Sequence, residues 1–175
     1  MSIKLSTMDY LNEAYKKGWR NTDEYGSFAM ELSGIAASNN MGLLCEFLDP
    51  CVPGAQYSVD CWRLARRVES VEELNRSLER LHRRFPDGKD KFPLAEPDHE
   101  IVSFPNNARF MLEIDLYLWG DSEQTIYYFD AVTFREYVRP IANAYLRYNP
   151  EKNPIISDMH RHLDHWVQRD FQKSP

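Results

Sequence analysis

Apolar and polar residues alternate between Ala108 and Trp119, and this is the clearest pattern in the chain. The even-numbered positions are Ala108, Phe110, Leu112, Ile114, Leu116 and Leu118. The odd-numbered positions are Arg109, Met111, Glu113, Asp115, Tyr117 and Trp119. A repeat of two residues is the period of a β-strand. Turn-forming residues follow at 120–124 and a β-branched and aromatic run at 125–131, so we predict one β-hairpin over 108–131.

The hairpin is expected to bury its even-numbered face against helices, because a one-residue slip would expose that apolar set. A short strand over His99–Phe104 is predicted to precede it and to complete an antiparallel meander over 99–131. Two earlier segments, Leu43–Leu48 and Tyr57–Val68, lie on either side of prolines and a glycine and suggest a first, more polar hairpin. The spacing within Tyr57–Val68 fits either a strand or a helix.

Five segments carry helix start signals or helical spacing of apolar residues. They begin at Ser6 or Thr7, Asn21, Ser70, Thr133 and Ser157. The clearest is the third, in which Ser70 and Glu73 form a capping box before an apolar stripe that ends at Phe85. Pro140 is expected to kink the fourth. Together these patterns predict an α+β fold in which an antiparallel sheet of three or more strands packs against about five helices.

The composition suits one compact domain, since 43% of the 175 residues are apolar. We therefore predict a single globular domain over residues 1–175. No run approaches the roughly 18 apolar residues that span a bilayer, and the N-terminus lacks the apolar centre of a secretory signal. The three cysteines are an odd number, which favours reduced thiols. These features predict a cytoplasmic protein that does not contact a membrane.

The negative charge is concentrated in residues 92–132, which we call the acidic segment. Eight acidic residues and one basic residue, Arg109, give it a charge of −7, whereas residues 1–91 sum to −1 and residues 133–175 to +2. Such a field attracts basic partners and repels nucleic acid. The alternative is that these acids only keep the surface of the sheet solvated.

Arginines at 76, 80, 83 and 84 raise a second possibility, a basic helix face that binds nucleic acid. Glutamates are interleaved with them at helix spacing, and Glu72–Arg76 and Glu79–Arg83 are expected to form intrahelical pairs. We therefore predict a self-paired, solvated helix face and no direct contact with nucleic acid.

The usual catalytic and metal-binding motifs are absent from the sequence. His160, His162 and His165 lie close together with Asp158, but ligands on one exposed helix make a poor metal site. Cys45, Cys51 and Cys61 lack the close spacing of zinc ligands. We predict no cofactor, no metal and no catalytic residue.

The candidate partner-binding surface is the odd-numbered face of the hairpin with its turn. Its residues are Glu113, Asp115, Tyr117, Trp119, Asp121, Glu123, Tyr128 and Asp130. Exposed aromatic side chains are typical anchors in protein recognition, and carboxylates beside them speed the encounter with a basic partner. The alternative is that another element covers this face and that its aromatic residues belong to the core.

In general character, a small, acidic, aromatic-rich α+β chain without catalytic motifs, the sequence resembles the immunity proteins that protect bacteria from toxins delivered by neighbouring cells, as in contact-dependent inhibition. The resemblance covers the whole chain and carries over no individual residue. It implies a stoichiometric inhibitor of a basic toxin such as a nuclease. An antirestriction or anti-CRISPR inhibitor would use the same physics. A small enzyme that uses Glu113, Asp115 or the C-terminal histidines as acid and base is the alternative from another class.

Overall fold

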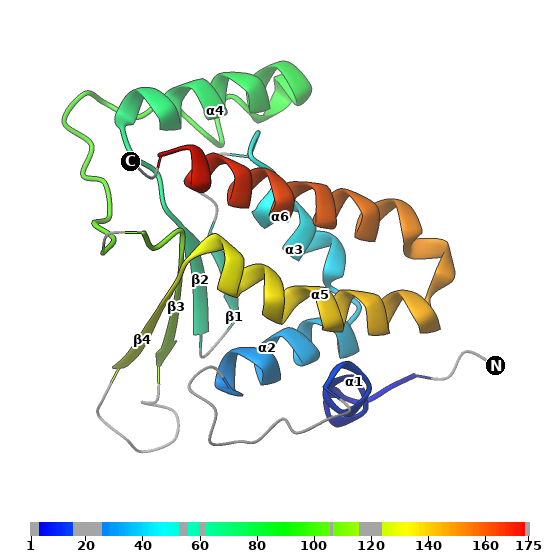
Figure 1. The fold of residues 1–175 in the computed structure, drawn as a ribbon. Coiled ribbons are helices and arrows are strands. Elements are labelled where there is room, and N and C mark those ends of the chain that lie inside the picture. The colour runs from blue at the N-terminus through cyan, green and yellow to red at the C-terminus, as the bar shows by residue number, and fades with distance from the viewer. Residues whose placement is uncertain are drawn as a thin grey trace. The chain divides into compact units, whose positions relative to one another are not determined.

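The computed structural model describes residues 4–15, 26–52, 56–59, 62–105, 107–115 and 124–173. Within these ranges the chain forms six α-helices and one four-stranded antiparallel sheet (Figure 1). The predicted α+β class is therefore confirmed. The chain divides into two compact units, Met1–Cys45 with Ala131–Pro175, and Glu46–Asp130, which we call the helical unit and the sheet unit. That all 175 residues form one domain stays a prediction.

The sheet unit contains four strands that pair in chain order. They are β1 (Gln56–Val59), β2 (Trp62–Arg66), β3 (Phe110–Asp115) and β4 (Gln124–Phe129). β2 pairs with β3 so that Leu64 lies opposite Leu112 and Arg63 opposite Glu113. β3 pairs with β4 so that Leu112 lies opposite Tyr127. The segment Tyr57–Val68, whose sequence fits either a strand or a helix, thus contains residues of two strands, β1 and β2, and no helix in its described part.

The predicted hairpin exists as β3 and β4, and its register follows from burial. Phe110 and Leu112 are fully buried and Ile114 is nearly so. Leu116 and the turn lie outside the described residues. The opposite face of the hairpin is not fully exposed to solvent, because Met111 of β3 and Arg109, just before β3, are buried too. The alternation identifies the strand correctly, but one buried face does not make the other face exposed.

Two predicted strands are wrong. Residues 99–104 form no strand, because β2 and β4 occupy both edges of β3. Leu43–Leu48 belongs to the helix α3 (Met41–Leu48). Met41, Leu44 and Leu48 are buried at helical spacing. The first hairpin is instead formed by β1 and β2.

In the sheet unit, α4 (Val71–Arg84) is the helix that the sequence predicts best. The Ser70 side chain accepts a hydrogen bond from the Glu73 amide at 3.0 Å. The Glu73 carboxylate accepts one from the Glu69 amide at 2.9 Å rather than from that of Ser70. A short 3-10 helix, η1 (Pro86–Gly88), follows. Phe85, which the stripe places inward, is exposed.

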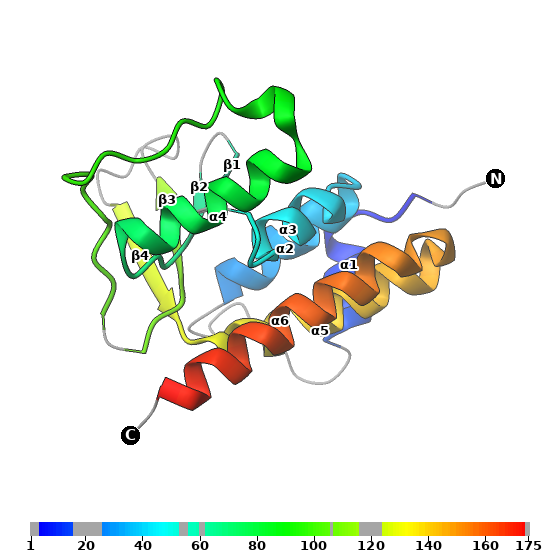
Figure 2. The same cartoon turned by 90° about the horizontal axis from the view of Figure 1, so that it is seen from above.

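In the helical unit, α5 (Ala131–Tyr148) contacts α1 (Thr7–Ala14), α2 (Gly26–Ala37) and α6 (Asn153–Lys173). α5 and α6 lie side by side, and the short η3 (Pro150–Lys152) joins them (Figures 1 and 2). The Phe28 and Phe134 rings lie 4.8 Å apart between α2 and α5. The Tyr15 hydroxyl donates to the Tyr137 carbonyl at 2.8 Å. Aromatic contacts therefore hold this unit around α5.

The predicted helix boundaries differ from the observed ones in ways that have simple causes. α1 is capped by Ser6, as predicted. α5 continues through Pro140. α6 begins four residues before Ser157, because Pro154 lies in its first turn, where the missing amide hydrogen has no intrahelical partner to lose. The predicted start at Asn21 lies outside the described residues.

Arg66 joins the end of β2 to the end of α3, and its side chain is only 5% exposed. Its guanidinium donates to the carbonyl oxygens of Phe47 at 2.8 Å and Asp49 at 2.7 Å, and also to that of Val52. Carbonyls at a helix C-terminus lack intrahelical partners and carry partial negative charge. The buried charge and the open carbonyls therefore satisfy each other.

Replacing Arg66 with methionine keeps an apolar stem but removes the guanidinium donor from the three carbonyls, of which that of Asp49 keeps the Val52 amide as a donor. We expect Arg66→Met to lower the free energy of unfolding by about 3 kcal/mol, measured by urea denaturation. Arg67→Met is the matched control, because the Arg67 side chain is only half buried and makes a long hydrogen bond of 3.4 Å to the Ala108 carbonyl. Equal losses in the two variants would contradict this role of Arg66.

Candidate functional site

Glu113, the first residue of the predicted surface, is engaged within the sheet. Its carboxylate lies 2.5 Å from the Arg63 guanidinium, directly across from it in the β2–β3 register. The Glu113 side chain is 18% exposed. A cross-strand pair of this kind contributes to pairing of the strands. Glu113 is therefore partly compensated and is not a free acidic group.

The other residues of the predicted surface are only partly described. Asp115 closes β3 and pairs with Gln124 in the register. Tyr117, Trp119, Asp121 and Glu123 lie outside the described residues. Tyr128 pairs with Met111, which places it on the Glu113 face. It is half buried, and its ring lies edge-on to Phe104 at 6.0 Å, so it packs against the chain that precedes the hairpin. Asp130 is exposed.

Residues 92–104 carry acidic groups that the strand-based prediction did not single out. This 92–104 segment has no regular secondary structure. Its first residues are hydrogen-bonded to α4. Asn75 donates to the Ala95 carbonyl at 3.0 Å and accepts from the Ala95 amide at 2.7 Å. The His82 ring lies 2.6 Å from the Phe92 carbonyl oxygen. Side chains of α4 thus hold irregular backbone in place.

Both acidic and apolar side chains of the 92–104 segment face solvent. Glu96, Asp98 and Glu100 are exposed. Phe92, Leu94 and Val102 are 47–50% exposed. Three large apolar side chains exposed within one short segment make that segment a candidate interaction site. The sequence carried one weak signal for this surface: Pro93 and Pro97 disfavour a strand interior around Phe92 and Leu94.

The one basic residue of the acidic segment, Arg109, is turned inward. Its side chain is 2% exposed and lies 3.3 Å from the Glu69 carboxylate. It also donates to the Arg67 carbonyl at 3.3 Å. Arg109 is therefore a buried ion-pair partner of Glu69, and the exposed carboxylates of Glu96, Asp98 and Glu100 make no ion pair in the described part of the chain.

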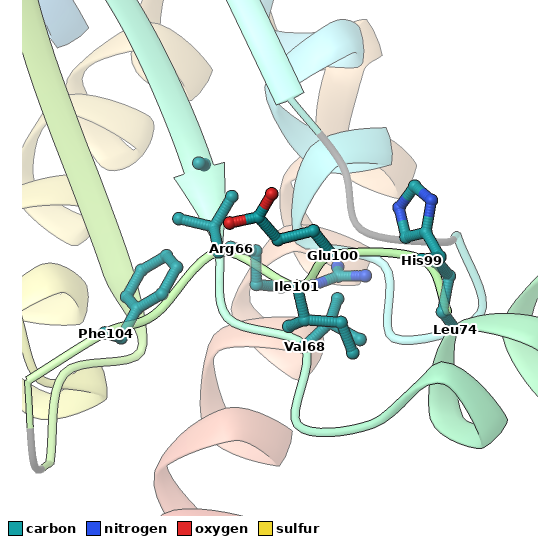
Figure 3. Close-up of a pocket in the computed structure, with 9 residues that line it drawn as sticks. Arg66, Val68, Leu74, His99, Glu100, Ile101 and Phe104 are labelled. Carbon is teal, nitrogen blue, oxygen red and sulfur yellow. The ribbon is translucent and has the colours of Figure 1, made fainter. Parts of the chain in front are cut away.

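A pocket of about 200 Å³ opens beside the 92–104 segment (Figure 3). Its walls come from the end of β2, from Val68, from Leu74 of α4, and from residues 99–102 with Phe104. Drug-sized ligands and cofactors occupy sites of roughly 300–1,000 Å³. The pocket is therefore small for a cofactor.

The histidines of α6 do not form a metal site with their neighbours. Within the described ranges, no group of three or more histidine, cysteine, aspartate or glutamate side chains comes together. The Asp158 carboxylate pairs with Arg161 at 2.7 Å. His165 lies edge-on to Trp166 at 5.2 Å. That the protein needs no metal stays a prediction.

His160 is the histidine with the most restrictive surroundings. Its Nε2 donates to the Asn143 side-chain oxygen at 3.0 Å. Its Nδ1 is buried and has no hydrogen-bond partner in the described chain. Burial lowers the pKa of His160, Arg139 lowers it further, and Asp164 opposes them. The neutral ring is therefore the form that the fold favours.

None of the helices in the described ranges is long and apolar enough to cross a membrane. Comparison with protein-family models, curated proteins and solved structures gave no match to this chain.

His160 should make the stability of the protein depend on pH. In the unfolded chain its pKa is about 6.5, and in the folded chain it is lower, so the unfolded chain binds the proton more readily. The contribution of the neutral His160 ring to the free energy of unfolding is fully present above the unfolded pKa and is lost as the pH falls below that pKa. We expect the Tm of wild type to fall by about 2 °C more than that of His160→Gln between pH 7.5 and pH 5. His99→Gln removes an exposed histidine as a control. Identical pH profiles for wild type and His160→Gln would refute this.

Metal removal should leave the fold unchanged. Dialysis against a strong chelator is expected to leave the Tm of the protein as it was, because a structural metal contributes folding free energy directly. A large drop in Tm that added zinc restores would show that histidines or cysteines bind a metal. Tm can be measured by circular dichroism before and after dialysis.

Proposed function

We propose that this chain is a stoichiometric binding protein that neutralises a basic protein partner through its acidic segment. The observation that carries the proposal is the 92–104 segment, where three exposed carboxylates, Glu96, Asp98 and Glu100, are flanked by exposed Phe92 and Leu94 on one side and Val102 on the other. Apolar side chains supply contact area, and carboxylates beside them select a basic partner and speed association.

We propose that, through this binding, the protein acts in the cytoplasm as an immunity-type inhibitor of a bacterial toxin. A nuclease toxin has a basic surface because it must bind phosphates. An acidic, partly apolar surface that covers such a site blocks it without any chemistry of its own. The hairpin residues Tyr117, Trp119, Asp121 and Glu123 remain part of the proposed surface, together with Asp130.

The described geometry gives the enzyme hypothesis less support. An acid–base enzyme needs carboxylates with perturbed pKa in a cleft. Glu113 is paired with Arg63. The pocket holds a single carboxylate, that of Glu100, which is exposed. A binding role needs neither a deep cleft nor a perturbed group.

Charge reversal at Glu96 and Asp98 tests the proposal. Lysine at both positions should leave the fold intact, because both side chains are exposed. It should slow association with the partner about tenfold at low salt, with a smaller effect at high salt, because exposed charges are screened. The partner is first captured from cells that encode the protein, and its association rate is then measured by surface plasmon resonance. Titration of the partner's toxic activity should end at equimolar protein.

The matched control reverses two exposed acids of the helical unit, Glu136 and Glu151. It changes the net charge by the same amount but lies outside the acidic segment. Glu113 is a poor position for reversal, because a lysine there would face Arg63 and disturb the sheet. If both double variants slow association equally, only net charge matters and the proposed surface is wrong.

A further inference from the structure

The pocket beside the 92–104 segment has the size of one amino-acid side chain. Its volume is about 200 Å³. A dry cavity of about 150 Å³ holds a benzene molecule, and small-molecule sites begin near 300 Å³. The volume therefore excludes a nucleotide or a large cofactor and admits one long side chain of a bound protein.

The lining of the pocket is mainly apolar. Val68 and Ile101 are half buried, and Leu74 of α4 and Phe104 complete the wall (Figure 3). An apolar stem that enters this space is removed from water on several sides, which is favourable in proportion to the area buried.

Of the two charged side chains at the pocket, Arg66 is already hydrogen-bonded within the protein, whereas Glu100 is available to bind a ligand. Arg66 is committed, because its guanidinium donates to three backbone carbonyls at the end of α3. Glu100 is exposed, and in the described part of the chain its carboxylate has no ion-pair or hydrogen-bond partner. His99 also lines the pocket and is exposed. A carboxylate that borders an apolar space favours a ligand with an apolar stem and a cationic end.

We propose that this pocket receives an arginine side chain of the basic partner. Its methylene groups lie against Val68, Leu74 and Ile101, and its guanidinium pairs with the Glu100 carboxylate. Arginine fits better than lysine, because its planar guanidinium donates two parallel hydrogen bonds to a carboxylate. Arginine is also enriched among the residues that dominate binding at protein interfaces. The inference rests on the proposed function, since it assigns one anchor residue to that partner.

Blocked amino acids test the pocket without the partner. N-acetyl-arginine methylamide, its lysine and leucine counterparts, and its uncharged isostere N-acetyl-citrulline methylamide are titrated into ¹⁵N-labelled protein. We expect the arginine probe to shift the amide resonances of Ile101 and Val102 and to bind about three- to fivefold more tightly than the citrulline probe, the range expected for one exposed ion pair.

Glu100→Gln should remove the difference between the arginine and citrulline probes and leave the fold unchanged, because the side chain is exposed. The matched control is Glu96→Gln, an exposed carboxylate of the same segment that does not line the pocket. It should keep the difference. The amide spectrum of each variant reports whether it is folded.

Three results would overturn the inference: no shift at Ile101 and Val102, equal binding of the arginine and citrulline probes, or tighter binding of the leucine probe. None of them touches the proposed function, whose test reverses Glu96 and Asp98 and uses the captured partner. Conversely, an arginine probe that binds as expected while the Glu96 and Asp98 reversal has no effect would support the pocket and refute the proposed surface.

Discussion

The sheet unit depends on how one buried charge is satisfied. Placing the Arg66 guanidinium at 5% exposure costs several kcal/mol unless every donor direction meets an acceptor. The carbonyls of Phe47, Asp49 and Val52 supply acceptors, and that of Phe47, in the last turn of α3, lacks an intrahelical donor. One guanidinium therefore positions the end of α3, the loop after it and the end of β2. Since Arg66 also borders the pocket, the same interaction supports the candidate site.

Sequence patterns predicted the parts of the fold that are encoded locally. The alternation around Leu112 identifies β3, and Ser70 identifies the start of α4, because each signal lies within one element. The pairing of β2 with β3 brings together segments more than forty residues apart, and no local period specifies such a partner. Leu43–Leu48 was misassigned for a related reason, since a short apolar run fits a strand or a buried helix equally well.

The sequence indicated the charge of the candidate site but not which of its residues are exposed. The excess of carboxylates in the acidic segment is visible in the sequence, but the sequence could not say which of them face water. Arg109 pairs with Glu69 inside the unit, and Glu113 pairs with Arg63 across the sheet. The charges of Arg109 and Glu113 are therefore partly neutralised within the fold. Among the described residues, the exposed acids of the segment are Glu96, Asp98, Glu100 and Asp130. The path of the 92–104 backbone depends on tertiary hydrogen bonds from Asn75 of α4 to Ala95. The spacing of apolar residues along the sequence does not predict such bonds.

The arrangement of unpaired charge on the sheet unit bears on how a partner would approach it. The intrahelical pairs expected on α4 are not formed, and within the described chain no carboxylate lies at ion-pair distance from Arg76, Arg80 or Arg83, all of which are exposed. Hydrogen bonds from Asn75 and His82 hold the 92–104 segment against this same helix. On the proposed function, a basic partner would meet mixed charge along α4, where exposed Glu72 and Glu79 lie among these arginines, and only negative charge along the 92–104 segment. Such an uneven distribution of charge would favour docking angles that bring the basic surface of the partner onto the 92–104 segment rather than onto α4.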